Sequence, residues 1–363
     1  MLYNKKRLYT GVAVLFLTVG IFSLFGFTGA DKSKKKSNNS TQMEWALVVH
    51  GGAGGKQKPR PDGTIPPMRM SEEKKADYEK HLAEAVALGK EMLSQGADAV
   101  DVVQAVVVYM EDCPLFNAGK GAVTTSDGVH ELDAAIMDGK TLEAGAIAGV
   151  KDVKNPVKLA REVMNNSPHV FLIGEGASAF AGERGLEIVE NSYFSTSGRL
   201  KEYNQYKVDS IPGKPMGTVG CVALDKKGNL AAATSTGGMR GKKWGRVGDV
   251  PVIGAGTYAN NKQVAISGTG HGELWIRSVV AHDIYALMEY KGLSLKEAAQ
   301  DVIWNKIDKM EGSGGGVICV DKQGNIVMEF DTGLMHRGWA TSNGEWGVGV
   351  LAGEDKKFND NVK

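Results

Sequence analysis

The sequence has few of the residues that would place it in several common classes of protein. Its 363 positions include only three cysteines and ten prolines, and lysine plus arginine (43) nearly equal aspartate plus glutamate (42). A sparse, odd set of cysteines does not fit a disulfide-bonded scaffold. A formal net charge of +1 does not fit a nucleic-acid binder that depends on bulk positive charge. With 42% hydrophobic residues, the chain is not a disordered tail, a collagen-like repeat or a coiled coil.

Glycine is abundant instead, and charge is unevenly placed. The 48 glycines follow no fixed period, which indicates many tight turns and backbone close to a ligand. Residues 1–30 carry three basic residues and no acid, and residues 31–43 carry four lysines and one aspartate. From residue 44 onward, 36 basic and 41 acidic residues leave a net charge of −5. We therefore expect an acidic body behind a basic arm, with residues 31–43 as a solvated, lysine-rich linker.

Residues 1–30 have the pattern of an export signal peptide. A basic flank at residues 5–7 precedes an apolar run over 11–27, and the small residues 28–30 fit a cleavage site. The alternative is an uncleaved membrane anchor, because 17 residues is at the short limit for spanning a bilayer. The absence of a cysteine near Ala30 argues against a lipoprotein. The sequence thus predicts a periplasmic or extracellular protein, either released or anchored by the uncleaved signal.

Hydrophobic periodicity predicts a mixed α+β fold. We expect helices over residues 72–93, 97–110, 156–165, 176–184, 273–289 and 295–307. Strands are expected over 45–50, 121–125 and 131–137, with hairpins within 218–236 and 315–332. We interpret residues 51–55 as a turn and residues 187–216, which are polar and without period, as a long loop. Because strands and helices cluster separately along the chain, stacked layers of helix and antiparallel sheet are expected.

Several catalytic motifs are missing from the sequence. The stretch HGGAGGK at 50–56 is not a Walker loop, which needs glycine where His50 stands and serine or threonine where Gln57 stands. There is no G-x-S-x-G elbow, no H-E-x-x-H and no paired cysteines, so an α/β-hydrolase serine or a zinc site has little support. Cys221 and Cys319 lie in apolar strand-like runs, where we expect buried free thiols.

Five separated motifs carry the functional signal: LFNAGKGAV (115–123), HELDAAIMDG (130–139), MGTVGCVALD (216–225), TSTGGMRGKKWGRVGD (234–249) and SGTGHGELWIR (267–277). Together they closely resemble the plant-type L-asparaginase and isoaspartyl peptidase family of N-terminal-nucleophile hydrolases. The resemblance runs from about Trp45 to Trp339. It implies a four-layer αββα sandwich and self-cleavage between Gly217 and Thr218. The products would be an alpha subunit, residues 44–217, and a beta subunit, residues 218–363, which form one composite domain.

The chemistry of such a family explains a threonine at position 218. A threonine hydroxyl is a poor nucleophile unless a base lies beside it. Cleavage before Thr218 frees an α-amino group with a pKa of roughly 8, which can act as that base. Gly217 suits the scissile bond because a residue without Cβ can be twisted and approached closely. Without the resemblance, Thr218 would be an ordinary β-branched strand residue.

The resemblance also implies partners for the nucleophile and the substrate. Thr236 would support the nucleophile through its hydroxyl; the alternative is an ordinary turn threonine. Arg246 and Asp249 would grip the free amino-acid end of the substrate, since guanidinium pairs with an α-carboxylate through a two-pronged fork and carboxylate pairs with an α-ammonium. The alternative for these two residues is a mutual surface salt bridge.

Four further positions complete the implied site. Thr269 and Gly270 would form the oxyanion hole, with a hydroxyl and a backbone N–H. Gly272 would contribute backbone contacts to the bound aspartyl group, and Asn117 would position the region of the nucleophile. His271 departs from the family pattern, in which we expect a small polar residue, and this departure affects access of the substrate.

The resemblance implies no cofactor for catalysis but allows a structural sodium ion. Main-chain carbonyls would hold it, and carbonyl oxygens suit a hard cation. The expected ligands are the main chains of Met110, Glu111, Cys113, Phe116, Ala118 and Lys120.

The implied activity is hydrolysis of β-aspartyl peptides and of the side-chain amide of L-asparagine, releasing L-aspartate. The cleaved units would form a dimer, with a small molecule or dipeptide as substrate and no nucleic-acid partner. One alternative is a glycosylasparaginase, which cleaves sugar-linked asparagine and fits an exported protein. Another is a non-catalytic exported binding protein, which would require the loss of a site residue. The five decisive residues are all present: Thr218, Thr236, Arg246, Asp249 and Thr269.

Overall fold

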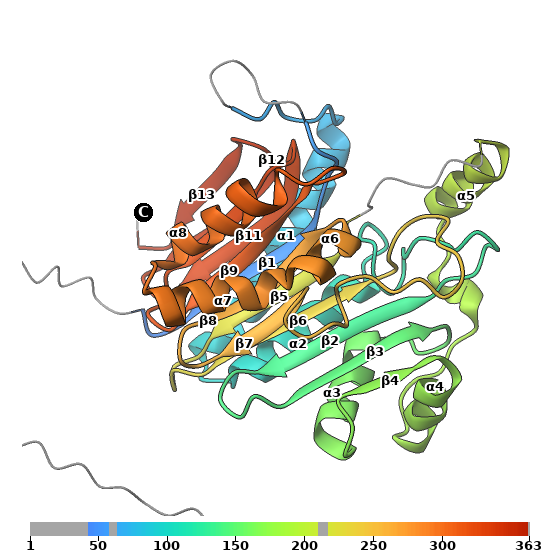
Figure 1. Cartoon of the computed structure of the whole chain (residues 1–363), viewed down its shortest axis with the longest axis horizontal. Coiled ribbons are helices and arrows are strands. Elements are labelled where there is room, and N and C mark those ends of the chain that lie inside the picture. The colour runs from blue at the N-terminus through green and yellow to red at the C-terminus, as the bar shows by residue number, and fades with distance from the viewer. Residues whose placement is uncertain (1–42, 58–63, 210–216, 362–363) are drawn as a thin grey trace, which may run out of the picture. The chain divides into compact units, whose positions relative to one another are not determined.

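The computed structural model describes residues 43–57, 64–209 and 217–361 (Figure 1). The strands of this part are β1 (Ala46–Ala53), β2 (Leu132–Asp138), β3 (Ala144–Val150), β4 (Phe171–Ile173), β5 (Val219–Leu224), β6 (Leu230–Thr236), β7 (Thr257–Asn260), β8 (Val264–Gly270), β9 (Gly315–Asp321), β10 (Ile326–Phe330), β11 (Leu334–Thr341), β12 (Glu345–Leu351) and β13 (Asp355–Asn359). The helices are α1 (Glu72–Ser94), α2 (Ala99–Asp112), α3 (Pro156–Asn166), α4 (Gly174–Glu183), the 3-10 turn η1 (Asn191–Phe194), α5 (Ser197–Asp209), α6 (Gly272–Ser278), α7 (Val280–Lys291), α8 (Leu295–Gln300) and the π-helical η2 (Asp301–Ile307).

The predicted signal peptide and nearly all of the predicted linker lie outside the described residues. Within the described ranges, no helix has both the length and the apolar character needed to cross a membrane.

The described strands form two sheets. A nine-stranded sheet has the order β13-β12-β11-β1-β5-β6-β2-β3-β4, and a four-stranded sheet has the order β10-β9-β8-β7. The strands of both sheets pair antiparallel, except for the short parallel pair of β3 and β4. The mixed α+β fold expected from the sequence is therefore confirmed.

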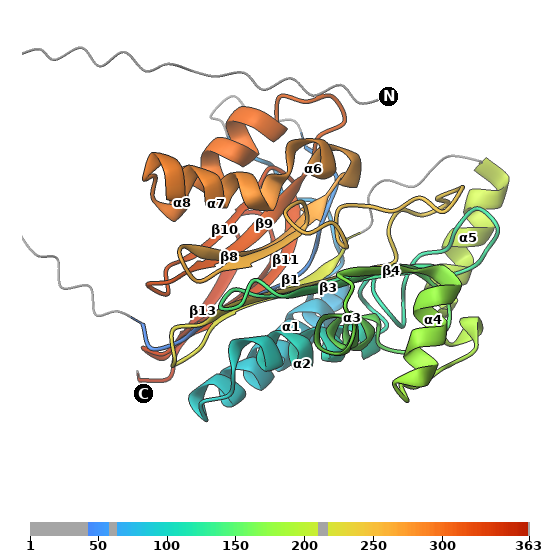
Figure 2. The ribbon, with the colours of Figure 1, turned by 60° about the horizontal axis from the view of Figure 1, so that its bottom comes forward.

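Four buried apolar clusters hold the described elements together, and the layers that they join can be followed in Figure 2. On one face of the large sheet, α1 packs against β1 and β11, α2 against β5 and β6, and α3 against β2 and β3. The other face contacts the small sheet, through β1, β5 and β6 against β7, β8 and β9. Helices α7 and α8 cover the outer face of the small sheet. Strands β1, β5, β6 and β9 are buried along their whole length, which explains why their sequences show no alternation of apolar and polar residues.

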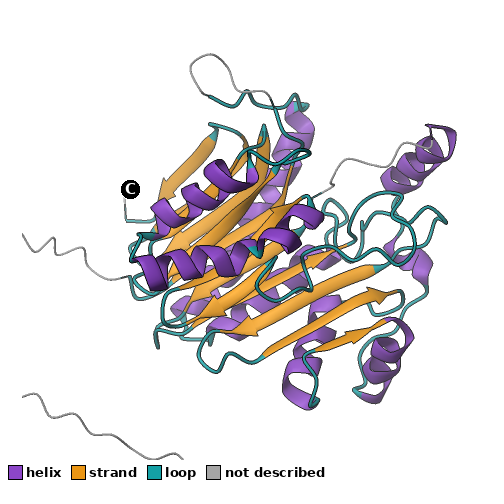
Figure 3. Ribbon diagram, viewed as in Figure 1, coloured by secondary structure: helices purple, strands orange, loops and turns teal. Residues whose placement is uncertain are grey.

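Most of the predicted elements are found close to their expected bounds. The helices predicted over 72–93, 97–110 and 156–165 correspond to α1, α2 and α3, and both predicted hairpins form, as β5–β6 and β9–β10 (Figure 3). Ser71 caps α1 by accepting from the backbone N–H of Lys74. Cys221 and Cys319 are buried free thiols as expected, and Cys113 is a third.

Two loop predictions were wrong. Residues 187–216 are not one loop, because they include η1 and α5. Helix α5 has a polar sequence that buries little beyond Arg199 and Tyr206, so no apolar stripe indicated it. The first three residues of the turn expected at 51–55 belong instead to β1, which continues to Ala53 through an irregularity between His50 and Gly52.

Three other predictions need correction. Residues 121–125 make only isolated bridges, from Thr124 to His130 and from Thr125 to Lys242, and not a strand. The single helix expected over 273–289 is two helices, because Val279 adopts a left-handed conformation with φ of 49° between α6 and α7. The helix expected over 295–307 changes to π-helical geometry at Asp301.

The β5–β6 hairpin positions the predicted nucleophile. Its register pairs Val219 with Ser235, so Thr218 and Thr236 lie side by side at the open end of the hairpin. Strand β8 of the small sheet ends nearby at Gly270. The predicted site residues therefore gather where strands of both sheets end.

Candidate active site

Thr218 and Thr236 are in direct hydrogen-bond contact. The hydroxyl of Thr218 donates to Oγ1 of Thr236 over 3.1 Å, and both residues are buried. Thr236 Oγ1 also accepts from the backbone N–H of Gly238 over 3.0 Å. The Thr236 oxygen thus accepts two hydrogen bonds, and the hydroxyl proton of Thr236 remains to be donated to a third group.

The carbonyl oxygen of Gly217, on the predicted scissile bond, is held by two donors. Asn117 donates from Nδ2 over 3.0 Å, and Thr236 donates from Oγ1 over 3.5 Å. The Asn117 amide is itself oriented, because its Oδ1 accepts from the backbone of Val123 over 2.8 Å. These donors polarise the carbonyl that a neighbouring hydroxyl would attack.

Two glycines allow the backbone to pass through this crowded place. Gly217 has φ of +48° and Gly52 has φ of +103°, both in the region that favours glycine. A Cβ on Gly52 would lie 2.3 Å from the Cα of Gly217. The irregular end of β1 therefore presses directly against the scissile bond.

A buried chain of hydrogen bonds begins at the backbone carbonyl of Thr218. Nδ1 of His50 donates to the Thr218 carbonyl over 3.1 Å, so Nε2 is the acceptor and receives the hydroxyl of Ser267 over 2.9 Å. Thr234 donates to Ser267 over 2.8 Å, and Thr257 donates to Thr234 over 2.7 Å. Burial lowers the pKa of His50 to about 3, so the imidazole is neutral. This chain joins both sheets to the backbone of the nucleophile.

The two residues expected to form the oxyanion hole lie at the end of β8. The hydroxyl oxygen of Thr269 accepts from the backbone N–H of Ala53 over 3.2 Å, which leaves the hydroxyl proton available. Gly270 lines the same cleft as Thr218 and Thr236. A Cβ at Gly270 would lie 2.8 Å from the ring of Trp275, so only glycine fits here.

Arg246 and Asp249 line this cleft too, but they do not pair with each other as a salt bridge. Arg246 instead forms a two-pronged pair with Glu273, from Nε over 2.9 Å and from Nη2 over 2.8 Å. The pair holds the guanidinium plane, while Nη1 lies beside the backbone of Gly248. Nothing in the sequence pattern of the helix indicates this role of Glu273.

Asp249 is a buried carboxylate with a vacant acceptor. Its Oδ2 has no hydrogen-bond partner among the described residues. Burial raises the pKa of Asp249 to about 7, against the opposing effect of Arg246. A Cβ on Gly272 would lie 2.7 Å from Arg246 Nη2 and 3.0 Å from Asp249 Oδ1, so glycine keeps this place open. The cleft thus offers a buried carboxyl group whose charged form a ligand ammonium would stabilise.

His271 turns away from this cleft. Its Nδ1 lies 3.1 Å from the carbonyl oxygen of Gly312, and its Nε2 lies 3.1 Å from Glu273. The side chain therefore links α6 to the segment that precedes β9. It also contacts the carboxylate that orients Arg246.

In the loop after α2, several main-chain carbonyls lie close to glycine backbone. A Cβ on Gly121 would lie 2.5 Å from the carbonyl oxygen of Pro114 and 2.7 Å from that of Phe116. A Cβ on Gly119 would lie 2.5 Å from the carbonyl oxygen of Glu111, which accepts from the backbone N–H of Lys120 over 2.7 Å. The buried Glu111 side chain has no partner for Oε2 among the described residues, and burial raises the pKa of its carboxyl to about 8, so it is mostly neutral at neutral pH. Carbonyl oxygens are the ligands that a small hard cation prefers, and Pro114 was not among the ligands expected.

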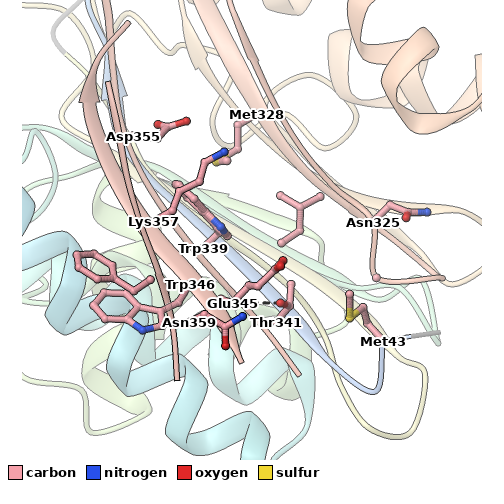
Figure 4. A pocket seen from close by; sticks show the side chains of 13 residues that line it. Met43, Asn325, Met328, Trp339, Thr341, Glu345, Trp346, Asp355, Lys357 and Asn359 are labelled. Atoms are coloured by element: carbon pink, nitrogen blue, oxygen red, sulfur yellow. Dashed lines mark hydrogen bonds between the residues drawn. The ribbon is translucent and has the colours of Figure 1, made fainter. Parts of the chain in front are cut away.

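A separate hollow lies between β10 and strands β11–β13 and is lined by Met328, Trp339, Glu345 and Lys357, among others (Figure 4). None of the predicted site residues lines it.

Three contributors to the site were missed by sequence reasoning: His50, Ser267 and Glu273. His50 and Ser267 are 217 positions apart and meet only because β1 and β8 lie in facing sheets. The sequence feature that could have indicated this link is His50 itself, a polar residue that follows an apolar run in the predicted strand.

The geometry defines a class of protein: a hydrolase whose threonine nucleophile directly follows a peptide bond that is itself held for attack.

A profile described as asparaginase matches residues 43–350. The isoaspartyl peptidase of Escherichia coli K12 is 49% identical over 304 residues, which cover 81% of this chain and 92% of that protein. The isoaspartyl peptidase of Salmonella typhimurium is 49% identical over 304 residues, covering 81% and 94%. The isoaspartyl peptidase/L-asparaginase of Xenopus laevis is 40% identical over 321 residues, covering 86% and 97%. The chain belongs to the asparaginase family and is an enzyme of that family.

The pKa of Asp249 predicts a pH dependence of ligand binding. Its carboxyl is neutral well below pH 7 and charged above, and only the charged form pairs with an ammonium. We expect the affinity for L-aspartate to fall about tenfold per pH unit below about pH 7. Calorimetric titration of the mature enzyme between pH 8 and pH 5 measures this. Asp249→Asn should bind weakly at every pH, and a wild-type affinity that stays flat across the range would contradict the assignment.

The buried chain through His50 predicts a graded loss of stability and processing. His50→Ala leaves the Thr218 carbonyl and the Ser267 hydroxyl without partners and opens a cavity, so unfolding should become easier by about 2–4 kcal/mol. Ser267→Ala removes the donor to His50 and the acceptor of Thr234 but leaves the Thr218 carbonyl paired, so it should cost less, about 1–2 kcal/mol. Urea unfolding gives the stabilities, and gel electrophoresis follows chain cleavage. A His50→Ala protein that is cleaved at the wild-type rate would show that the chain does not position Thr218.

Proposed function

We propose that this chain is a self-cleaving threonine hydrolase that releases L-aspartate from β-aspartyl (isoaspartyl) peptides and from the side-chain amide of L-asparagine. The observation that carries the proposal is the arrangement around one peptide bond. The Gly217 carbonyl is held by Asn117 and Thr236, and the adjacent Thr218 hydroxyl points at Thr236. The substrates named for the relatives from Escherichia coli and Xenopus laevis support the substrate class.

Maturation follows from this geometry. The Thr218 hydroxyl oxygen adds to the carbonyl carbon of Gly217, and the negative charge on the oxygen is stabilised by Asn117 and Thr236. The C–N bond then breaks, the hydroxyl proton passes to the nitrogen, and Gly217 is left as an ester of Thr218. Water hydrolyses the ester. The products are a carboxylate on Gly217 and a free α-amine on Thr218.

The mature site then repeats the same chemistry on a substrate. The α-amine of Thr218 takes the hydroxyl proton as the hydroxyl attacks the side-chain carbonyl of the aspartyl group. Thr269 and the backbone of Gly270 stabilise the oxyanion. The proton moves to the departing amine, and water hydrolyses the aspartyl ester. Asp249 pairs with the substrate ammonium and Arg246 with its carboxylate, which orients the reacting bond.

The proposal extends to the assembly of the enzyme. We infer the four-layer αββα sandwich of N-terminal-nucleophile hydrolases, an alpha subunit of residues 44–217 and a beta subunit of residues 218–363. The packing of helices on the outer faces of two contacting sheets supports this arrangement. We also propose export directed by residues 1–30, to the periplasm or cell exterior, and a dimer of the cleaved units.

A structural sodium ion is part of the proposal. The carbonyls of Glu111, Pro114 and Phe116 would hold it, and the charge on the ion would stabilise the turn that carries Asn117. Catalysis itself requires no cofactor in this scheme, because Thr218 supplies both nucleophile and base.

Glycosylasparaginase activity is the second candidate, favoured by the export-signal pattern of residues 1–30. Turnover of a β-aspartyl dipeptide, compared with that of a glycosylated asparagine, separates the two. We expect the dipeptide to be the better substrate. Faster cleavage of the glycosylated compound would assign the enzyme to the second activity.

Self-cleavage predicts two fragments on a denaturing gel. The larger should end at Gly217, and the smaller should begin with Thr218 when its N-terminus is sequenced. Thr218→Ala removes the nucleophile and should leave the chain intact and inactive, whereas Thr218→Ser should still be cleaved, because it keeps a hydroxyl. Full β-aspartyl activity from an intact chain after long incubation would overturn the mechanism.

A further inference from the structure

A second hollow lies on the other side of the scissile bond, and we call it the distal hollow. Its backbone wall is residues 51–55 at the end of β1, and Asn117 and Gly217 form its inner end. The cleft that holds Thr218, Arg246 and Asp249 shares only one lining residue with it, Gly217. In the uncut chain, the scissile residue therefore separates two adjoining hollows.

The distal hollow is lined by cations and by no acid. Arg69, Lys74 and Arg199 line it, and none of its described lining residues is aspartate or glutamate. Arg199 is already engaged, with the Gly121 carbonyl and with Glu202. Arg69 and Lys74 are exposed, and neither forms an ion pair with a described carboxylate. Two cations are thus available to an anionic ligand.

The remaining wall of the distal hollow is largely apolar, and its aromatic residue is held in place by neighbouring groups. Met68, Met70, Leu115 and Leu334 line it together with Tyr78. The ring of Tyr78 stacks on His336 with centroids 3.9 Å apart, and its hydroxyl donates to the Leu115 carbonyl over 3.3 Å. The Lys74 ammonium lies 6.0 Å from the centre of the Tyr78 ring. A cation beside a fixed apolar wall matches a ligand with one carboxylate and one apolar group.

The direction of the substrate follows from the two hollows. With the amino-acid end of the aspartyl group at Arg246 and Asp249, the bond to be cut reaches Thr218 from that cleft. Whatever is attached beyond this bond extends away from Arg246 and Asp249. The distal hollow is lined by Gly217, the residue directly before the nucleophile, so it becomes the adjoining space for such a group once Gly217 is a chain end and can move.

We propose that the distal hollow is the subsite for the leaving half of a β-aspartyl peptide, an apolar amino acid whose α-carboxylate pairs with Lys74 and Arg69. This inference rests on the proposed function and specifies its substrate. A peptide leaving group carries both features, a carboxylate and a side chain. The leaving group of L-asparagine is ammonia, which has neither and does not reach Lys74 or Arg69. The two substrates therefore differ in their use of the distal hollow.

The test compares kcat/KM for β-aspartyl-leucine and L-asparagine in the mature enzyme. Lys74→Ala and Arg69→Ala should each lower kcat/KM for β-aspartyl-leucine, relative to that for L-asparagine, about threefold. The double variant should lower it about tenfold, since each substitution removes one exposed charge pair. The effect should be a higher KM for β-aspartyl-leucine with little change in kcat, and Lys74→Arg should keep the wild-type KM. Lys80→Ala removes an exposed lysine on the same helix and outside the distal hollow, and it should leave the ratio unchanged.

A second substrate isolates the carboxylate. β-Aspartyl-leucine amide lacks the charge that Lys74 and Arg69 would recognise, so wild type should hydrolyse it about tenfold less efficiently than the acid, and the double variant should treat both alike. Equal losses on β-aspartyl-leucine and L-asparagine, or equal wild-type turnover of acid and amide, would overturn the inference. Absence of turnover of any of these substrates by the wild type would instead refute the proposed function.

Discussion

The close approach of two glycine backbones is the constraint on which the rest of the site depends. No side chain fits between Gly52, at the irregular end of β1, and Gly217, at the scissile bond. This contact fixes the direction of the Gly217 carbonyl toward Asn117, and it places Thr218 at the first position before β5. The strands of two sheets must meet at their ends for this to happen, and the apolar cores between the layers provide the energy that holds them there.

Burial then sets the charge of the groups around the nucleophile. His50 is kept neutral, because its pKa falls to about 3, and it serves as a fixed hydrogen-bond link between Ser267 and the Thr218 backbone. Asp249 is buried and its Oδ2 has no partner among the described residues, so its charged form is disfavoured below about pH 7 and would be stabilised by a cationic ligand. Arg246 is oriented in advance by Glu273. In the proposed mechanism, binding energy is concentrated on a zwitterionic amino-acid end, which directs the neighbouring carbonyl to Thr218.

Local patterns predicted the elements that bury an apolar face, and they failed where tertiary contacts decide. The β5–β6 hairpin and α1 were predictable from their hydrophobic patterns, whereas α5 buries too little apolar surface to show a period. The helix break at Val279 could not be predicted, because a β-branched residue is a rare choice for a left-handed conformation. In the site, sequence motifs identified Thr218, Thr236 and Asp249 as candidates. The His50–Ser267 link and the Arg246–Glu273 pair join distant segments and became visible only in the fold.

The central claim is that the hydroxyl of Thr218 cleaves the bond that precedes it through an ester of Gly217. Maturation in water enriched in the heavy isotope of oxygen, followed by mass spectrometry of both fragments, tests this claim most directly. The account predicts one heavy oxygen in the new carboxylate of Gly217 and none in the hydroxyl of Thr218, because water attacks the acyl carbon. A heavy oxygen on Thr218, or a mature chain that remains uncut between Gly217 and Thr218, would contradict it.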